Sequence, residues 1–157
     1  MNGIPPPDML RAIGATFDLD PCAPEQARAF YSVRAKKEFT KRDDGLKQPW
    51  RGFVFMNPPF GGRNGHVPWL KKFLDHDNGI AIVRAYTSAA WFHDYAIKAD
   101  ALLFPRGKTK FVRADGTVCK APGHGIVLLG CGSRAITALK ESNLGLCIVR
   151  IGTDFKL

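Results

Sequence analysis

A short stretch with unusual chemistry follows an apolar run near the middle of the chain. Asn57, Pro58, Pro59 and Phe60 come directly after residues 53–56, and two glycines follow them. Asn57 carries an amide oxygen that accepts hydrogen bonds, and Pro58 keeps its backbone carbonyl although it lacks an N–H. The prolines fix φ, and Phe60 offers a flat apolar face on which a planar heterocycle can stack. The stretch therefore predicts a stiff corner that holds two acceptors beside an aromatic ring.

Such a corner suits an exocyclic amino group on a purine or cytosine, which has two N–H donors and a ring to stack. Two accepted hydrogen bonds draw the lone pair of that nitrogen out of conjugation with the ring. The nitrogen then acts as a nucleophile without a strong general base, because positioning and directed hydrogen bonds provide most of the catalysis. The alternative is that residues 57–60 form a structural turn at the end of a strand.

The elements around this corner alternate between apolar strands and amphipathic helices. Strands are expected at residues 15–21, 51–57, 79–86, 101–105, 126–132 and 144–152, with a further short strand and a turn at 115–116 between 106 and 125. Residues 5–14 are expected to form a Pro-rich entry, an Asp8 cap and a short helix closed by Gly14. Further helices are expected at residues 67–76, 88–99 and 133–142, with Thr87 or Ser88 and Ser133 as N-caps, and one or two helical turns at 25–31. Residues 33–48 are polar and are expected to form a loop. The alternation predicts an α/β protein with a largely parallel sheet that is covered on both faces.

Ligands of such sheets bind beyond the carboxyl ends of the strands. The expected strand at residues 15–21 carries Asp18 and Asp20, and the strand at 51–57 leads into Asn57 and Phe60. We therefore expect these four side chains on one rim of the sheet.

The length of 157 residues predicts a single domain. No apolar run approaches the ~20 residues of a membrane span, and the first residues do not read as a signal peptide, so a cytoplasmic protein is expected. The 4 cysteines lack the spacing of zinc ligands, which predicts inert thiols and no metal site. The net charge of +9 favours a polyanion as partner, with a basic but merely solvated surface as the alternative.

Several separated stretches resemble, in the same order, the small phage and prophage DNA N-6-adenine methyltransferases. These stretches are FDLDPCA, DDGLKQPWRGFVFMNPPFG, WLKK, TSAAWFHDYA, FPRGKTKF and KAPGHGIVLLG, and the resemblance covers roughly residues 4–130. It implies a Rossmann-like methyltransferase fold, S-adenosylmethionine as cofactor and an adenine flipped out of DNA as substrate. It also suggests modification of phage DNA against restriction, in the bacterial cytoplasm.

The resemblance implies a role for several residues. Asn57, Pro58, Pro59 and Phe60 match the motif that binds the target amine. Cofactor binding is implied for Asp18 and Asp20, and Asp20 would bind the ammonium group of the cofactor. Pro21, Cys22 and Ala23 would form a backbone wall beside the cofactor. Asp44 would accept hydrogen bonds from its adenine ring or its ribose. Capping and turn formation are the alternative for the three aspartates. Pro24 follows this wall where larger methyltransferases have glycines, so the cofactor loop is either rebuilt or weakened.

An enzyme acting on a base-paired amine must extrude the base, and phosphate contacts then position the nucleic acid. The candidate DNA-binding residues are Arg63, Arg106, Lys108, Lys110, Arg113 and Lys120. Loops around residues 33–48 and 105–124 are candidate DNA-contacting insertions, although charge runs often form only a solvated face. The chain has no room for a separate recognition domain, so a short target site or loose specificity is expected.

Two other hypotheses remain on the sequence alone. The same fold can act on an RNA amine or a protein glutamine amide, although the basic charge argues against a protein target. A catalytically silent nucleic-acid-binding module is the third hypothesis, and the absent glycine loop supports it.

Overall fold

The computed structural model describes residues 3–26, 28–62, 64–120 and 124–156, and these residues share one eight-stranded sheet. The strands are β1 (Phe17–Asp20), β2 (Ala35–Glu38), β3 (Val54–Met56), β4 (Gly79–Arg84), β5 (Ala101–Pro105), β6 (Ile126–Cys131), β7 (Gly145–Ile151) and β8 (Asp154–Lys156). The helices are α1 (Pro7–Ile13), α2 (Val67–His76), α3 (Ala90–Asp94) and α4 (Ser133–Glu141), with short 3₁₀ turns η1 (Arg28–Phe30) and η2 (Ala96–Lys98).

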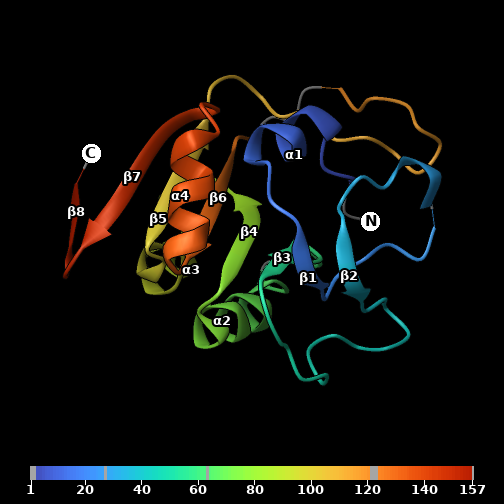
Figure 1. Ribbon diagram of the computed structural model, residues 1–157, viewed down its shortest axis with the longest axis horizontal. Coiled ribbons are helices and arrows are strands. Elements are labelled where there is room, and N and C mark those ends of the chain that lie inside the picture. Colours follow the sequence, from blue (N-terminus) through green and yellow to red (C-terminus); the bar gives the residue numbers. More distant parts are fainter. Residues whose placement is uncertain (1–2, 27, 63, 121–123, 157) are drawn as a thin grey trace.

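The strands follow the order β2-β1-β3-β4-β6-β5-β7-β8 across the sheet (Figure 1). Pairing is parallel from β2 to β4 and antiparallel from β4 to β8. The sheet is therefore mixed, and the expectation of a mostly parallel sheet is not confirmed. The long segment after β5 brings β6 back between β4 and β5 in the reverse direction. β6 is buried along its whole length, so its apolar sequence does not show whether it pairs parallel or antiparallel with its neighbours.

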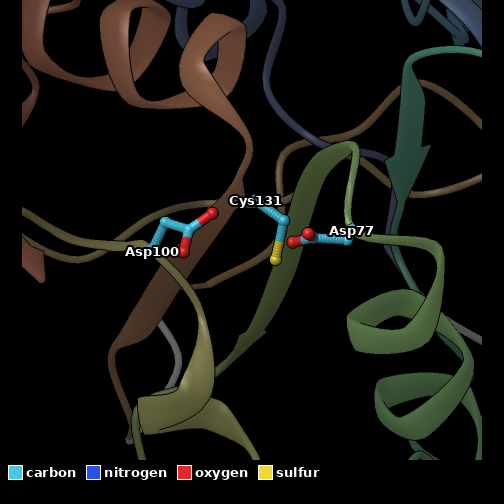
Figure 2. Close-up of side chains that lie close together, drawn as sticks. All are labelled: Asp77, Asp100 and Cys131. Carbon is cyan, nitrogen blue, oxygen red and sulfur yellow. The ribbon is translucent and has the colours of Figure 1, made fainter. Parts of the chain in front are cut away.

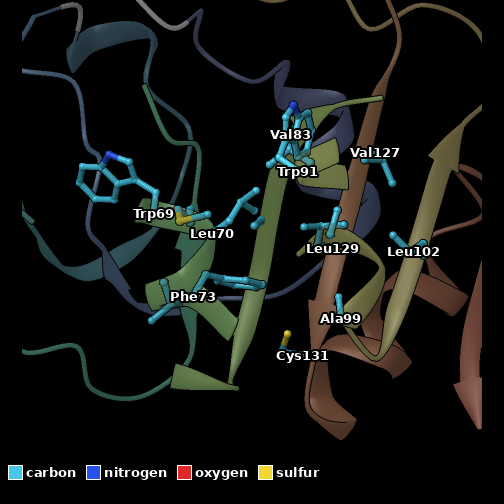
Figure 3. Close-up of a cluster of buried hydrophobic side chains, with 14 of the residues drawn as sticks. Trp69, Leu70, Phe73, Val83, Trp91, Ala99, Leu102, Val127, Leu129 and Cys131 are labelled. Atoms are coloured by element: carbon cyan, nitrogen blue, oxygen red, sulfur yellow. The ribbon is translucent and has the colours of Figure 1, made fainter. Parts of the chain in front are cut away.

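Helices cover both faces of the sheet, as expected. Side chains of β3 alternate, so Phe55 belongs to one apolar cluster together with Leu139 of α4. Met56 belongs to the cluster on the other face. Figure 3 shows Leu70 of α2 and Trp91 of α3 in this second cluster. Two buried layers therefore hold the strand that leads into the Asn-Pro-Pro-Phe corner.

The four expected helices are present, and α2 has the expected bounds. α1 begins after Pro6, so Asp8 lies in its first turn and is not the cap that was expected. α3 is shorter than expected and begins after Ala89, without a side-chain cap from Thr87 or Ser88. α4 follows Gly132, and Ser133 is its first residue rather than its cap. Every helix in the described part of the chain is too short or too polar to cross a lipid bilayer.

The expected loop at residues 33–48 contains β2, so that part of the prediction is wrong. Among the described strands, β2 pairs with β1 alone and places Ala35 opposite Phe17. As an edge strand it keeps exposed lysines and lacks a regular apolar alternation. β8, the other edge strand, was not predicted. The strand expected between residues 106 and 125 is reduced to isolated bridges from Val112 to Ile4 and to Val118.

The chain after β2 is held against α2 by buried and half-buried groups. The indole N–H of Trp50 donates to the carbonyl of Gly45 at 2.8 Å. The Lys72 ammonium donates to the carbonyls of Leu46 and Gln48 at 2.6 and 2.5 Å. These bonds fix the turn that carries Asp44.

Candidate active site

The carboxyl ends of the parallel strands meet at one edge of the sheet. Asp20 ends β1, Asn57 follows β3, and Arg84 ends β4. β3 lies between β1 and β4 and pairs parallel with both. The sheet therefore brings the end of β1 and the Asn-Pro-Pro-Phe corner to one rim, as expected for Asp20, Asn57 and Phe60.

The Asn57 side chain is 7% exposed, and its Nδ2 donates to the carbonyl of Gly3 at 3.1 Å. Only the nitrogen of a carboxamide can donate to a carbonyl, so this bond sets the orientation of the amide. The oxygen Oδ1 then lies on the other side of the group. Gly3 belongs to the segment before α1 and was not among the predicted site residues, because a contact over so many positions leaves no local pattern.

Two cavities meet at this corner. The first, of about 420 Å³, we name the Asn57 cavity; Gly3, Ile4, Pro21, Cys22, Pro24, Tyr31, Thr40, Lys41, Asp44, Gly45, Asn57, Pro59 and Trp69 line it. The second, of about 400 Å³, we name the Phe60 cavity; Gly3, Pro59, Phe60, Gly61, Arg84, Phe111, Cys119, Lys120, His124 and Ile126 line it. Gly3 and Pro59 belong to both linings, so the corner stands between two spaces.

The predicted cofactor residues divide between several places. Pro21, Cys22 and Asp44 line the Asn57 cavity. Ala23 lines a neighbouring cavity of about 730 Å³ beside Val112 and Arg113.

Two of these residues are held by local bonds. Asp20 is completely buried, and its Oδ1 accepts the backbone N–H of Cys22 at 2.9 Å. Burial, with a smaller contribution from Asp20, raises the pKa of the Cys22 thiol well above its ordinary value, so the thiol is protonated.

Asp18 lies apart from the Asn57 cavity. Its Oδ2 accepts the backbone N–H of Phe53 at 2.8 Å, and its Oδ1 forms an ion pair with Lys36 of β2 at 2.9 Å. The hydrogen bond from Phe53, followed by that from Lys36, lowers the pKa of the carboxyl. Its side chain lines a separate space beside Lys37 and Gly52. These contacts favour a structural role, and a cofactor role for Asp18 stays a prediction.

The turn at Asp44 and Gly45 packs directly on the end of β1. A Cβ atom on Gly45 would overlap the carbonyl oxygen of Pro21, so only glycine fits this approach. Asp44 adopts a positive φ of 53° and pairs with Lys47 at 3.0 Å. The glycine that allows a close backbone approach to β1 therefore comes from the loop after β2 and not from the turn after β1.

Phe60 is surrounded by aromatic and cationic groups. The Arg84 guanidinium lies 4.7 Å from the Phe60 ring centroid, and the His66 ring lies 6.2 Å from it. His66 is buried and packs edge-on against Trp91 at 4.3 Å. Burial, and then the charge of Arg84, lowers the pKa of His66. Arg84 was missed in the sequence because it ends a strand whose pattern indicates only burial.

The basic residues predicted to bind DNA lie mostly on the segment between β5 and β6. Arg106, Lys108, Lys110, Arg113 and Lys120 are all exposed. Two of them lie at the cavities: Lys120 lines the Phe60 cavity and Arg113 lines the neighbouring one. Arg63 lies outside the described residues.

A second polar cluster lies at the opposite edge of the sheet, where Asp77, Asp100 and Cys131 point toward one another (Figure 2). Asp100 already accepts the backbone N–H of Gly132 at 2.8 Å and pairs with Arg150 at 3.3 Å. Burial, with the charge of Asp100 second, raises the pKa of Cys131 to about 12. A protonated thiol and an engaged carboxylate make this a structural junction.

The fold and site define an α/β protein with two adjoining ligand spaces at the carboxyl ends of parallel strands, joined by an Asn-Pro-Pro-Phe corner. Residues 6–127 match the family model described as DNA N-6-adenine-methyltransferase (Dam), and the chain belongs to this family. The matched residues include the corner, the basic segment and the lining of both cavities except Gly3 and Ile4. The match confirms the resemblance to the DNA N-6-adenine methyltransferases. No curated protein and no solved structure matched the chain.

Proposed function

We propose that this protein transfers a methyl group from S-adenosylmethionine to the exocyclic N6 amine of adenine in DNA. Family membership supports the reaction class. The main support for the proposal is that the corner lies between two cavities, with Asn57 lining one and Phe60 lining the other. A transfer between two bound molecules needs such adjoining spaces, because the reacting atoms must meet.

The residues of the Asn57 cavity suit S-adenosylmethionine. The Asp44 carboxylate is an acceptor for ribose hydroxyls, and Tyr31 and Trp69 provide aromatic surface for an adenine ring. The protonated Cys22 thiol is a poor nucleophile, which protects it from methylation. When bound, the cofactor supplies an electrophilic methyl group.

The corner then prepares the target amine. The Asn57 Oδ1 and the Pro58 carbonyl accept the two N–H bonds of N6, and Phe60 stacks on the ring. This arrangement directs the nitrogen lone pair toward the Asn57 cavity. The proton that N6 loses after transfer leaves to water, so no side chain is assigned as a base.

Base extrusion brings the target to Phe60. The exposed cations between β5 and β6 hold the DNA backbone, and the net charge of +9 supports their role. Recognition of sequence falls to loops, so we propose a short or loosely defined target. The biological setting that the reaction suggests is the modification of phage DNA against restriction, inside the bacterial cytoplasm.

Methyl transfer from labelled S-adenosylmethionine tests the proposal, with DNA, RNA and total protein as separate acceptors. We expect label in DNA as N6-methyladenine and no label with Asn57→Ala. Asn64→Ala is the matched control, since Asn64 is exposed in the loop that follows the corner. Label in RNA alone or in protein alone would show that the substrate is RNA or protein and not DNA. Failure to bind S-adenosylmethionine in a direct titration would leave a nucleic-acid-binding module instead.

A further inference from the structure

Arg84 has an unusual position for a charged residue. It ends β4 and lines the Phe60 cavity, where its side chain is half-buried. The guanidinium lies over two aromatic rings, 4.7 Å from the centroid of Phe60 and 5.7 Å from that of Tyr86. Cation–π contacts of this kind hold a planar cation in one orientation.

The charge of Arg84 has no carboxylate partner among the described residues, and the remaining residues include no aspartate or glutamate. Within the described chain its Nε is buried without a hydrogen bond. Among the arginines whose burial the structure describes, the other half-buried one is Arg150, which pairs with Asp100 at 3.3 Å. A cation withdrawn from water is normally paired, so Arg84 is suited to an anion that comes with a ligand.

The surroundings of Arg84 favour the same kind of ligand. The described lining of the Phe60 cavity contains Lys120 and His124 but no acidic residue. Lys108 lies close enough to His124 to lower its pKa together with Arg84, after burial as the main cause. The charged groups in the described lining are therefore the two cations Arg84 and Lys120.

We propose that Arg84 binds the phosphate that flanks the extruded adenine. The inference rests on the proposed function, and it makes the substrate a nucleotide within a chain rather than a free base or nucleoside. Adenine itself is neutral, so stacking on Phe60 leaves the charge of Arg84 unmatched, and the flanking phosphates are the nearest anions of an extruded nucleotide. The planar fork of a guanidinium fits two phosphate oxygens at once. Because Arg84 also stacks on Phe60, it fixes the phosphate relative to the ring against which the base lies.

The first test is binding of a fluorescent DNA duplex over a range of salt concentrations, which needs no activity. Arg84→Gln removes one phosphate contact, so the magnitude of the negative slope of log K against log salt should fall by about 0.9. Arg84→Lys should keep the slope but bind more weakly, because the charge stays and the fork is absent. Arg134→Gln is the matched control, since Arg134 also stacks on a phenylalanine, Phe53, at 4.3 Å but at the opposite edge of the sheet. An unchanged slope in a folded Arg84→Gln protein would overturn the proposal.

The second test places a neutral methylphosphonate on either side of the adenine at which methylation has been mapped. One of the two substitutions should weaken binding to the wild type by about tenfold or more, the effect of losing a charge-assisted hydrogen bond, and leave binding to Arg84→Gln unchanged. Equal weakening in both proteins would show that another residue binds that phosphate, and this would overturn the role proposed for Arg84. The proposed function would still stand if the wild type transferred methyl groups to DNA. If the wild type methylated nothing, the salt titration would still decide the role of Arg84.

Discussion

The side-chain amide of Asn57 donates a hydrogen bond to the backbone carbonyl of Gly3, 54 positions away in the chain. Beside Gly3, Ile4 exchanges two backbone hydrogen bonds with Val112, at 2.8 and 2.9 Å. One short segment thus contacts both the corner and the basic segment between β5 and β6. The orientation of the candidate catalytic amide therefore depends on a strand-like contact that lies outside the named strands.

Asn57→Asp tests whether this bond orients the amide. An aspartate keeps an acceptor oxygen for N6 but cannot donate to the Gly3 carbonyl, and its charge repels that oxygen. Leaving the half-buried Gly3 carbonyl without its donor costs up to about 1–3 kcal/mol. We expect kcat to fall by roughly 5- to 150-fold on that basis, with unchanged DNA affinity, measured by single-turnover methylation. Full activity would mean that the bond to Gly3 is not required, and Asn64→Asp controls for the added charge.

Gly3→Ala tests the contact from the other side. An added Cβ would lie 2.5 Å from the Cβ of Phe111, so the two segments must separate, and we expect the segment between β5 and β6 to move. Overpacking of this kind costs about 1–3 kcal/mol. We expect weaker methylation and faster proteolysis between residues 106 and 120. Gly125→Ala is the control, because the Cβ there would meet Ala85 only at 3.8 Å. Equal proteolysis of wild type and Gly3→Ala would contradict the expected movement.

The corner and its place on the sheet were predictable because both depend on local sequence. An apolar run followed by Asn57 and two prolines marks the carboxyl end of a buried strand, and β3 has that position. Asp18 shows the limit of such reasoning. Its partner Lys36 comes from an edge strand whose polar sequence resembles a loop, so the ion pair follows only once β2 is placed beside β1.

The direction of β6 and the position of the Arg84 side chain were not predictable for a related reason. A fully buried strand has the same apolar pattern in a parallel or an antiparallel pairing. Arg84 ends β4, and its position in the sequence does not show that Phe60 and Tyr86 lie within cation–π distance. Contacts between distant segments decide both features.

Phe60→Ala tests the stacking surface. Removal of one base–aromatic stacking interaction should cost roughly 1–3 kcal/mol, which lowers kcat/KM by about 5- to 150-fold. Phe60→Tyr keeps the ring and should retain most of the activity. Steady-state methylation of a mapped DNA site measures both variants. A decrease as large with tyrosine as with alanine would mean that the phenylalanine acts through packing and not through stacking on the base.

Charge removal on the basic segment tests the DNA footprint. Lys108 and Lys110 are exposed on the segment that borders the Phe60 cavity. The double change to glutamine should lower the salt slope of duplex binding by up to about 1.8, or roughly 0.9 for each phosphate that the protein no longer neutralises. Lys140→Gln removes a charge from α4 and should leave the slope unchanged. A slope that is unchanged in the double variant would place the DNA elsewhere.

The two histidines beside Arg84 provide a pH-dependent test of its position. Burial first, and then Arg84, holds the pKa of His66 and of His124 below the ordinary 6.5. Both rings therefore bind fewer protons when folded, so their contribution to the unfolding free energy is complete above pH ~6.5 and is lost as pH falls through the folded pKa values. Arg84→Gln should raise both pKa values in an NMR titration, whereas Arg134→Gln should not. Unshifted histidines in Arg84→Gln would show that the guanidinium does not lie in the Phe60 cavity in solution.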